Sequence, residues 1–354
     1  MIYREAGQFR TTYVADQRIF PITQDRVAMA MLLIVAFVVV PAAASNYVLT
    51  ALLLPMLVLA IAALGLNILT GYAGQFSLGT AAFMSVGAFA AYNFQLRVPG
   101  IPLLVTFVLA GLVAAGVGLV FGLPSLRIKG FYLAVATLAA QFFVDWLFTK
   151  VAWFSNDSPS GTITAQPMVI AGLPIDSPAR RYLLVLSIAA VLALAAKNLS
   201  RTATGRAWMA VRDMDVAAEV IGIPILRTKL VAFGISSFYC GVSGALMVFL
   251  WYGGAESTVF NINQSFTILF MIIIGGLGSL LGSFLGAALI YILPIILRFV
   301  PPELGIPLHA ATVEHLTFMI TGALIVLFLI AEPAGLSRLW QIGKQKLRVW
   351  PFPY

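Results

Sequence analysis

Apolar runs about as long as a bilayer is thick recur along the whole 354-residue chain. A helix needs roughly 20 mainly apolar residues to cross the hydrocarbon core of a membrane. Short polar or Gly/Pro-rich breaks separate the runs, so the sequence predicts an all-α polytopic membrane protein of about ten transmembrane helices. The predicted spans are residues 28–45, 47–70, 76–94, 102–124, 130–149, 182–197, 229–252, 265–277, 280–298 and 313–331.

Composition agrees with lipid as the main solvent, because the chain is 61% hydrophobic and 10% charged, whereas soluble proteins are about a quarter charged. The net charge of +8 comes from basic residues in short segments between apolar runs, which is unlike the continuous basic surface of a nucleic-acid-binding protein. Cys240 is the only cysteine, so the chain can form neither an internal disulfide nor a cysteine-based metal site.

Two parts of this span prediction admit an alternative. The run from Phe266 to Val300 is interrupted by glycines, which favours two helices over one long tilted helix. The first span could instead be a cleaved signal peptide, since small residues follow it at 41–45. A long polar segment with Glu5, Asp16 and Asp25 precedes that run, which favours a transmembrane span.

Positive charge predicts the orientation, because Lys and Arg concentrate on the cytoplasmic side of membrane spans. An even number of spans with both termini inside makes residues 1–27, 198–228 and 332–354 cytoplasmic and residues 151–181 a periplasmic loop. The basic residues then predicted inside are Arg4, Arg10, Arg18, Arg26, Arg127, Lys129, Lys197, Arg201, Arg206, Arg212, Arg227, Lys229, Arg338, Lys344, Lys346 and Arg348. Those predicted outside are Arg97, Lys150, Arg180, Arg181 and Arg298.

The inward segment at 198–228 has the pattern of a short amphipathic helix. Its apolar residues Trp208, Val211, Val216, Val220 and Ile223 fall near one helical face, and Gly222 with Pro224 ends it. Both a helix on lipid headgroups and a helix docked into a cytoplasmic partner fit this pattern.

Two glycine-containing segments are candidates for a role inside the membrane. The first combines polar side chains with helix-weakening glycines. Broken helices that line a cavity or are buried in protein have this combination, so the segment is a candidate translocation path or gate. A structural role is the alternative. Its residues are Asn67, Thr70, Gly71, Gly74, Gln75, Ser77 and Gly79. The second is predicted to serve close helix packing. Its residues are Gly275, Gly276, Gly278, Gly282 and Gly286.

Charged groups give little sign of chemistry. Asp145 is expected to form an interfacial pair with Lys150, whereas a secondary transporter would more often keep a carboxylate near mid-membrane. His309, Glu314 and His315 match no zinc spacing, so we expect no metal site. The chain also lacks the Gly-x-x-x-x-Gly-Lys-Ser/Thr motif that binds nucleotide phosphates, and it is therefore not expected to be an enzyme by itself.

The stretch VAAEVIG at 216–222 resembles the Ala-Ala-x-x-x-Gly core of the coupling motif in permeases of ATP-binding-cassette (ABC) importers. One departure is Val216, which stands where that motif usually has Glu. The resemblance implies that this loop rests in a cleft of an ATPase subunit. The residues it assigns to ATPase coupling are Gly205, Arg206, Arg212, Asp215, Ala217, Ala218, Glu219 and Gly222.

Segments 64–89, 126–139 and 272–287, followed by AEPAGL at 331–336, resemble the LivM family of branched-chain amino-acid permeases in order and spacing. The related permease of urea importers shares these features. The resemblance implies an ABC importer permease fold in a bacterial inner membrane, moving branched-chain or other hydrophobic amino acids by alternating access. Urea, amides and small aromatic or carboxylic acids are alternative solutes, and a stand-alone secondary transporter or channel is the competing class.

The same resemblance implies the partners. They are a homologous LivH-type permease, two cytoplasmic ABC ATPases that bind ATP and Mg, a periplasmic solute-binding protein and membrane lipid. No cofactor is expected on this chain itself.

Overall fold

The computed structural model describes residue 12 and residues 23–125, 132–158, 161–166, 168–170, 173–303, 310–332 and 334–349. Several residues used in the orientation and metal arguments lie outside these ranges, as does most of the segment 1–27. They are Arg4, Arg10, Arg18, Arg127, Lys129 and His309.

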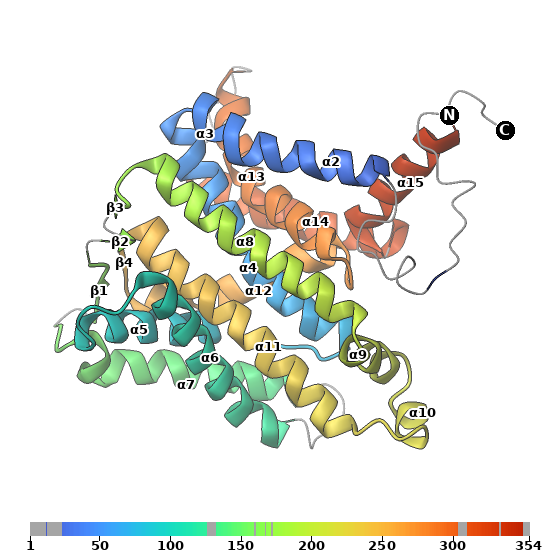
Figure 1. Cartoon of the computed structure of the whole chain (residues 1–354), viewed down its shortest axis with the longest axis horizontal. Helices are drawn as coiled ribbons and strands as arrows, with labels where there is room; N and C mark the ends of the chain where they lie inside the picture. Colours follow the sequence, from blue (N-terminus) through green and yellow to red (C-terminus); the bar gives the residue numbers. More distant parts are fainter. Residues whose placement is uncertain are drawn as a thin grey trace.

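Helices occupy every predicted span, with boundaries that differ by a few residues (Figure 1). The α-helices of the membrane part are α2 (Thr23–Ile34), α3 (Val40–Ala43), α4 (Leu54–Asn67), α5 (Thr80–Arg97), α6 (Leu103–Ser125), α7 (Tyr132–Lys150), α8 (Pro178–Arg201), α11 (Ile225–Leu246), α12 (Ile262–Gly275), α13 (Leu280–Glu303) and α14 (Ala310–Ala331). π-Helical turns η1 (Val35–Val39), η2 (Val48–Leu53), η3 (Ile68–Tyr72) and η5 (Met247–Tyr252) join or extend them. Short helices α9 (Ala203–Asp213) and α10 (Asp215–Val220) precede α11, and α15 (Gly335–Val349) follows α14.

Eight helical segments of the described chain are long and apolar enough to cross a membrane. The other two predicted spans correspond to α5, whose last turns carry Asn93, Gln95 and Arg97, and to α12. Helix α12 has 14 residues, about 21 Å, which is less than the roughly 30 Å of a hydrocarbon core. The chain is a polytopic helical membrane protein, and the count of ten spans stays a prediction.

The run from Phe266 to Val300 contains two helices, so the alternative of one long helix is wrong. Gly276 and Gly278 separate α12 from α13 with φ values of +116° and +77°. Residues with a Cβ rarely adopt such angles, and the glycines are therefore what allows the chain to reverse here.

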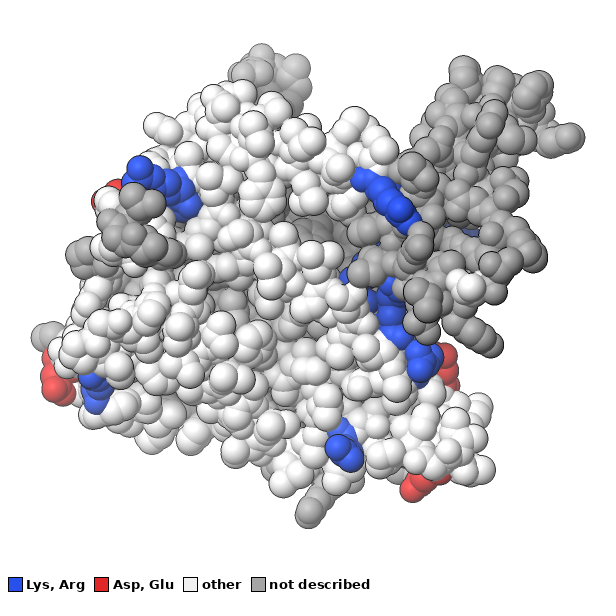
Figure 2. Space-filling view, viewed as in Figure 1, with Lys and Arg blue, Asp and Glu red and all other residues white. Residues whose placement is uncertain are grey.

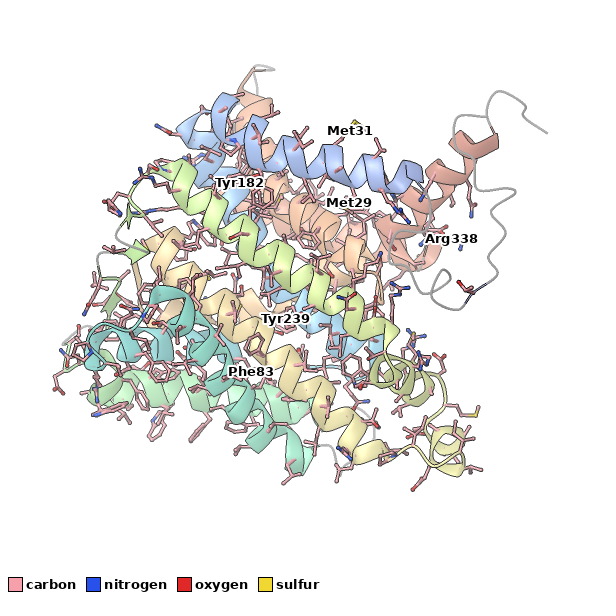
Figure 3. The ribbon with its side chains drawn as sticks, in the orientation of Figure 1. Met29, Met31, Phe83, Tyr182, Tyr239 and Arg338 are labelled. Carbon is pink, nitrogen blue, oxygen red and sulfur yellow. The ribbon has the colours of Figure 1, made fainter. Side chains whose placement is uncertain are left out.

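Helices α4 and α11 form the centre of the bundle. Most of their residues are buried, and α11 packs against α4, α5 and α6 (Figure 1). Helix α4 also contacts α8, α12 and α13. Two tyrosine hydroxyls form hydrogen bonds between neighbouring elements (Figure 3). Tyr239 of α11 donates to the Leu192 carbonyl of α8, and Tyr182 of α8 donates to the Ala36 carbonyl of η1.

The polar segments lie at opposite ends of the bundle. Figure 1 shows the strands at one end and α9, α10 and α15 at the other. In the face seen in Figure 2, charged side chains gather at these two ends and leave an uncharged band between them. Strand β1 (Ile163–Thr164) of the loop 151–181 pairs antiparallel with β4 (Gly254–Ala255) after η5, and β2 (Val169–Ile170) pairs with β3 (Leu173–Pro174).

The expected pair between Asp145 and Lys150 is not formed among the described residues, and Asp145 Oδ1 is buried there without a hydrogen-bond partner. The two residues both belong to α7. Five helical positions correspond to a rotation of about 140°, which turns the two side chains to different faces. The prediction of an interfacial ion pair is therefore wrong.

Candidate functional site

The segment before α11, which the sequence predicts to face the cytoplasm, is two helices rather than one amphipathic helix. Met214 is extended, with φ −159° and ψ 98°, and it separates α9 from α10. Trp208 and Val211 of α9 are buried in the bundle, and Trp208 Nε1 donates to the Thr228 carbonyl at 3.0 Å. The single apolar face predicted from the sequence is wrong, because this break turns the later apolar residues away from the bundle.

The second half of this segment exposes its apolar side chains. We call residues 214–222 the α10 tip. Met214, Val216, Val220 and Ile221 are 65%, 61%, 83% and 73% exposed, at a polar end of the molecule. A cluster of exposed apolar side chains is typical of a surface that contacts another protein or a membrane.

Some of the predicted coupling residues lie in α9, which packs on the bundle, and the others lie in the α10 tip. Gly205 is buried in the first turn of α9, next to the end of α8. A Cβ at this position would meet the Leu199 and Ser200 carbonyls. Ala218 is the buried residue of α10. Gly222 ends the tip with φ +87° and has open space around its Cα. The exposed members of the set are Arg206, Arg212, Ala217, Glu219 and Gly222, and Asp215 is half-buried.

The first glycine segment begins where α4 ends. Helix α4 continues as the π-helical η3, and Gly74 then reverses the chain with φ +67°. Asn67, in the last turn of α4, is completely buried. Its Nδ2 donates to the Ser279 carbonyl at 2.8 Å and to Ser283 Oγ at 2.9 Å, and its Oδ1 accepts from Gly278 N at 2.8 Å. One amide side chain therefore ties α4 to the start of α13.

The two glycine breaks touch each other. A Cβ on Gly71 would collide with Asn67 Oδ1 and with the backbone nitrogen of Gly278. We call Asn67, Gly71, Gly74, Gly278 and Ser279 the glycine junction. Three residues predicted for the path, Asn67, Gly71 and Gly74, thus share one site with Gly278, which was predicted for packing.

Arg212 of α9 joins the coupling segment to this junction. Its Nη1 donates to the Gly71 carbonyl at 2.8 Å. Its aliphatic part covers Gly74, where a Cβ would lie 2.8 Å from Arg212 Cγ. Asp213 Oδ1 accepts from Arg212 Nε at 2.9 Å, which fixes the guanidinium from its other edge. The contact between α9 and the junction is therefore a charge-assisted hydrogen bond from an arginine with little freedom.

Of the remaining predicted path residues, Thr70 lies in η3, and Gln75, Ser77 and Gly79 lie between the junction and α5. The Thr70 hydroxyl donates to the Gln75 carbonyl at 3.1 Å, and Gln75 Nε2 donates to the Ala73 carbonyl at 3.2 Å. Ser77 is buried, and Gly79 lies against the Thr137 carbonyl of α7. The hydrogen bonds of Thr70 and Gln75 shape the irregular backbone, and a role in solute passage stays a prediction.

Sequence reasoning missed three residues that hold the start of α5. Thr137, Gln141 and Ser265 are buried and accept hydrogen bonds from the Leu78, Ala82 and Ala81 nitrogens respectively. Gln141 also donates to the Phe260 carbonyl at 2.6 Å. A buried helix start needs such partners for its free N–H groups. Gln141, a polar residue inside an apolar span, was the one signal that could have revealed this site.

The other predicted packing glycines lie around the α12–α13 turn. Gly275, Gly282 and Gly286 face one another or Met271 so closely that a Cβ would meet backbone atoms. Gly276 faces the start of α15, where a Cβ would meet the Ala334 carbonyl and Ser337 Oγ. Gly278, which the sequence analysis grouped with these packing glycines, lies before α13 and belongs to the junction.

Comparisons with known proteins place this arrangement in a family. The E. coli K12 protein "High-affinity branched-chain amino acid transport system permease protein LivM" is 28% identical over 298 residues, 77% of this chain and 66% of that protein. A "Probable branched-chain amino acid transport permease protein LivM" of Methanocaldococcus jannaschii is 26% identical over 276 residues, 75% of this chain and 76% of its own. The "Fructose import permease protein FruG" of Bifidobacterium longum is 24% identical over 270 residues, covering 72% and 75%.

No solved structure matches the chain. A family model described as "Branched-chain amino acid transport system / permease component" matches residues 47–329, which include both glycine breaks, α9 and the α10 tip. The chain therefore belongs to this family of transport permeases.

Proposed function

We propose that this permease subunit imports branched-chain or other hydrophobic amino acids, and that ATPase motion reaches its glycine junction through Arg212. The observation that carries the proposal is the 2.8 Å hydrogen bond from Arg212 Nη1 to the Gly71 carbonyl. It joins the segment that resembles an ATPase-coupling loop to the broken end of the central helix. The family match and the LivM relatives support the solute class.

The proposed partners follow from this arrangement. One of the two cytoplasmic ATPases docks on the α10 tip, whose exposed apolar residues and Glu219 supply the contact. A homologous permease completes the solute path, and a periplasmic binding protein delivers the solute to the end that carries the strands. Both termini are then cytoplasmic.

The coupling step is a transmitted displacement. Helix α9 has 11 residues, about 16 Å, and Trp208 and Val211 anchor it in the bundle. When the ATPases close on the tip, α9 moves as a unit and Arg212 carries the Gly71 carbonyl with it. Interfaces of this kind switch between discrete arrangements. Asn67 then passes the change from α4 to Gly278 and Ser279 at the start of α13.

The junction acts as a gate element rather than as a solute contact. Asn67 is fully buried, and both ends of its amide are bonded within the chain. A solute would have to displace those bonds, each of which costs about 1–3 kcal/mol when a buried partner is left unpaired. Movement of the junction with these hydrogen bonds intact avoids this cost.

The first test uses the complete transporter reconstituted in liposomes with its partners. Arg212→Gln removes the charge-assisted bond to Gly71, worth about 1.5–3 kcal/mol, so we expect solute uptake per ATP hydrolysed to fall about tenfold. Lys346→Gln, an exposed basic residue of α15 at the same end, is the matched control and keeps uptake normal. Normal coupling in the Arg212 variant would contradict the proposal.

A second test addresses the tip. Glu219→Arg and Gly222→Asp change exposed residues, so membrane insertion stays intact while uptake is abolished. Normal uptake by either variant would remove the coupling assignment.

A cysteine placed at Arg212 tests the orientation in the membrane, because Cys240 is buried and leaves the new thiol as the accessible one. Labelling of that thiol from the periplasmic side of intact cells would invert the topology.

Solute class is tested with the binding protein that belongs to this transporter. Leucine, isoleucine and valine are expected to raise its melting temperature and to drive uptake in competition assays. Stabilisation by urea, an amide, an aromatic acid or a sugar instead would move the chain to another solute, while uptake without ATPases would favour a stand-alone carrier.

A further inference from the structure

A groove of about 730 Å³ lies between α5, α6 and α7, away from the glycine junction. Its floor is aromatic: Phe89 and Phe148 stack with ring centroids 4.2 Å apart, and Phe154 packs edge-on against Phe148. Val120 and Phe143 at its rim are 69% and 47% exposed. Because these residues belong to predicted membrane helices, the groove opens toward lipid.

One end of the groove is cationic. Arg97 is the charged residue among the described lining residues. Its Cζ lies 3.6 Å from the Trp153 ring centroid, and its Nη2 donates to the Trp153 carbonyl at 2.8 Å. A guanidinium has five N–H donors in a fork that matches a phosphate, so donors are left for a ligand. Exposed tryptophan and basic residues at helix ends are typical of headgroup depth.

The groove has the length of one leaflet. On α5 it runs from Val86 to Arg97, eleven positions, which corresponds to about 16 Å. This is roughly half of the 30 Å hydrocarbon core. The volume and length of the groove are sufficient for a single extended hydrocarbon chain.

We propose that this groove binds one acyl chain of a glycerophospholipid and that Arg97 binds its phosphate. Asn93 supports a polar group near the same end. Asn93 is one of the residues that line the groove. Its Nδ2 donates to the Phe89 and Phe154 carbonyls, while its Oδ1 is buried without a hydrogen-bond partner among the described residues. A buried acceptor of this kind calls for a donor such as a headgroup hydroxyl, ammonium or accompanying water.

The test uses the assembled transporter in nanodiscs with two photoreactive probes that share the same diazirine-bearing acyl chain. One is phosphatidylglycerol and the other is diacylglycerol, which lacks the phosphate. Mass spectrometry of the cross-linked peptides locates the label. We expect the phospholipid probe to label the groove segments of α6 and α7 about fivefold more than diacylglycerol, because a charge-assisted bond selects the phosphate.

Two variants separate chain binding from phosphate binding. Gly116 lines the groove, and no atom lies within 4 Å of the position that a Cβ would take there, so Gly116→Leu fills the groove without a clash. It is expected to reduce labelling by both probes about fivefold. Gly322→Leu on α14 is the matched control, since Gly322 is also exposed with open space around it, and its labelling stays unchanged. Arg97→Gln is expected to abolish the preference for phosphatidylglycerol and leave diacylglycerol labelling intact.

Several outcomes would overturn the proposal. They are equal labelling by the two probes in the unaltered protein, a phosphate preference that survives Arg97→Gln, or labelling that survives Gly116→Leu. If no lipid label is found in the groove, and the neighbouring permease is found cross-linked to the groove residues, this face would be a contact between subunits. Each result is independent of transport activity, so it does not depend on the proposed solute.

Discussion

Two spans near the N-terminus differ completely in their surroundings although their mean hydropathy is nearly equal. In the span Val48–Tyr72, which includes α4, 67% of the most apolar window is buried, whereas in Arg26–Ala43 the figure is 0%. Lipid tails are as apolar as a protein interior, so hydropathy identifies a membrane span without saying which neighbours it has.

Small and polar residues account for the difference. On α4, Gly65 lies against the backbone of α11, where a Cβ would be 2.9 Å from the Ser236 carbonyl, and Asn67 bonds across to α13. On α2, Met31 and Leu32 are 57% and 60% exposed, and Met31 points away from the bundle (Figure 3). Close helix contact in a membrane depends on such small residues and polar bonds.

The largest expected effect comes from a glycine in the bundle centre. Gly244 of α11 faces the backbone of Met84 in α5, so the side chain in Gly244→Val must push the two helices apart. We expect a loss of about 3 kcal/mol or more, enough to prevent folded protein from accumulating. Thermal denaturation in detergent, with the yield of monodisperse protein, measures this.

The matched change in a peripheral helix sharpens the contrast. Gly322 of α14 has no atom near its Cβ position, so Gly322→Val is expected to leave yield and melting temperature close to those of the unaltered protein. Equal damage from the two substitutions would show that α14 is as enclosed as α11.

An intermediate effect is expected at the glycine junction. Asn67→Leu keeps the side-chain size but leaves the Gly278 N–H and the Ser279 carbonyl without their partner, which costs about 2–4 kcal/mol. Ser283→Ala removes one of the three bonds and should cost about 1 kcal/mol. Melting temperatures of the two variants measure this order, and a reversed order would contradict the pinning role of Asn67.

A small loss of stability is expected where the peripheral span is attached. Tyr182→Phe removes the hydrogen bond to the Ala36 carbonyl, worth about 0.5–1.5 kcal/mol, and leaves the ring in place. The melting temperature should barely change. Disulfide trapping between cysteines on α8 and the first span should become slower, and a large fall in stability would instead make the first span part of the core.

The candidate site could be predicted only in pieces. The coupling segment, the first glycine segment and the second glycine segment were each visible in the sequence, as polar or glycine-rich stretches among apolar runs. The sequence did not show that these segments contact one another, because Gly278 and Asn67 are 211 positions apart, and Arg212 and Gly71 are 141 positions apart. Short-range patterns carry no information about such pairs. The break at Met214 was hidden for a related reason, since a continuous helical pattern runs across it.

The sequence by itself indicated that lipid surrounds the protein and where its helices lie, because long apolar runs have only helices as a stable form in lipid. Its motifs also indicated the family. It also determined where those helices break, since Gly74, Gly276 and Gly278 adopt backbone angles that other residues avoid. Only the tertiary structure decided which helices lie inside and which face lipid, and that Arg212 reaches the junction. Those choices depend on close contacts and single hydrogen bonds between distant segments, which equal hydropathy cannot distinguish.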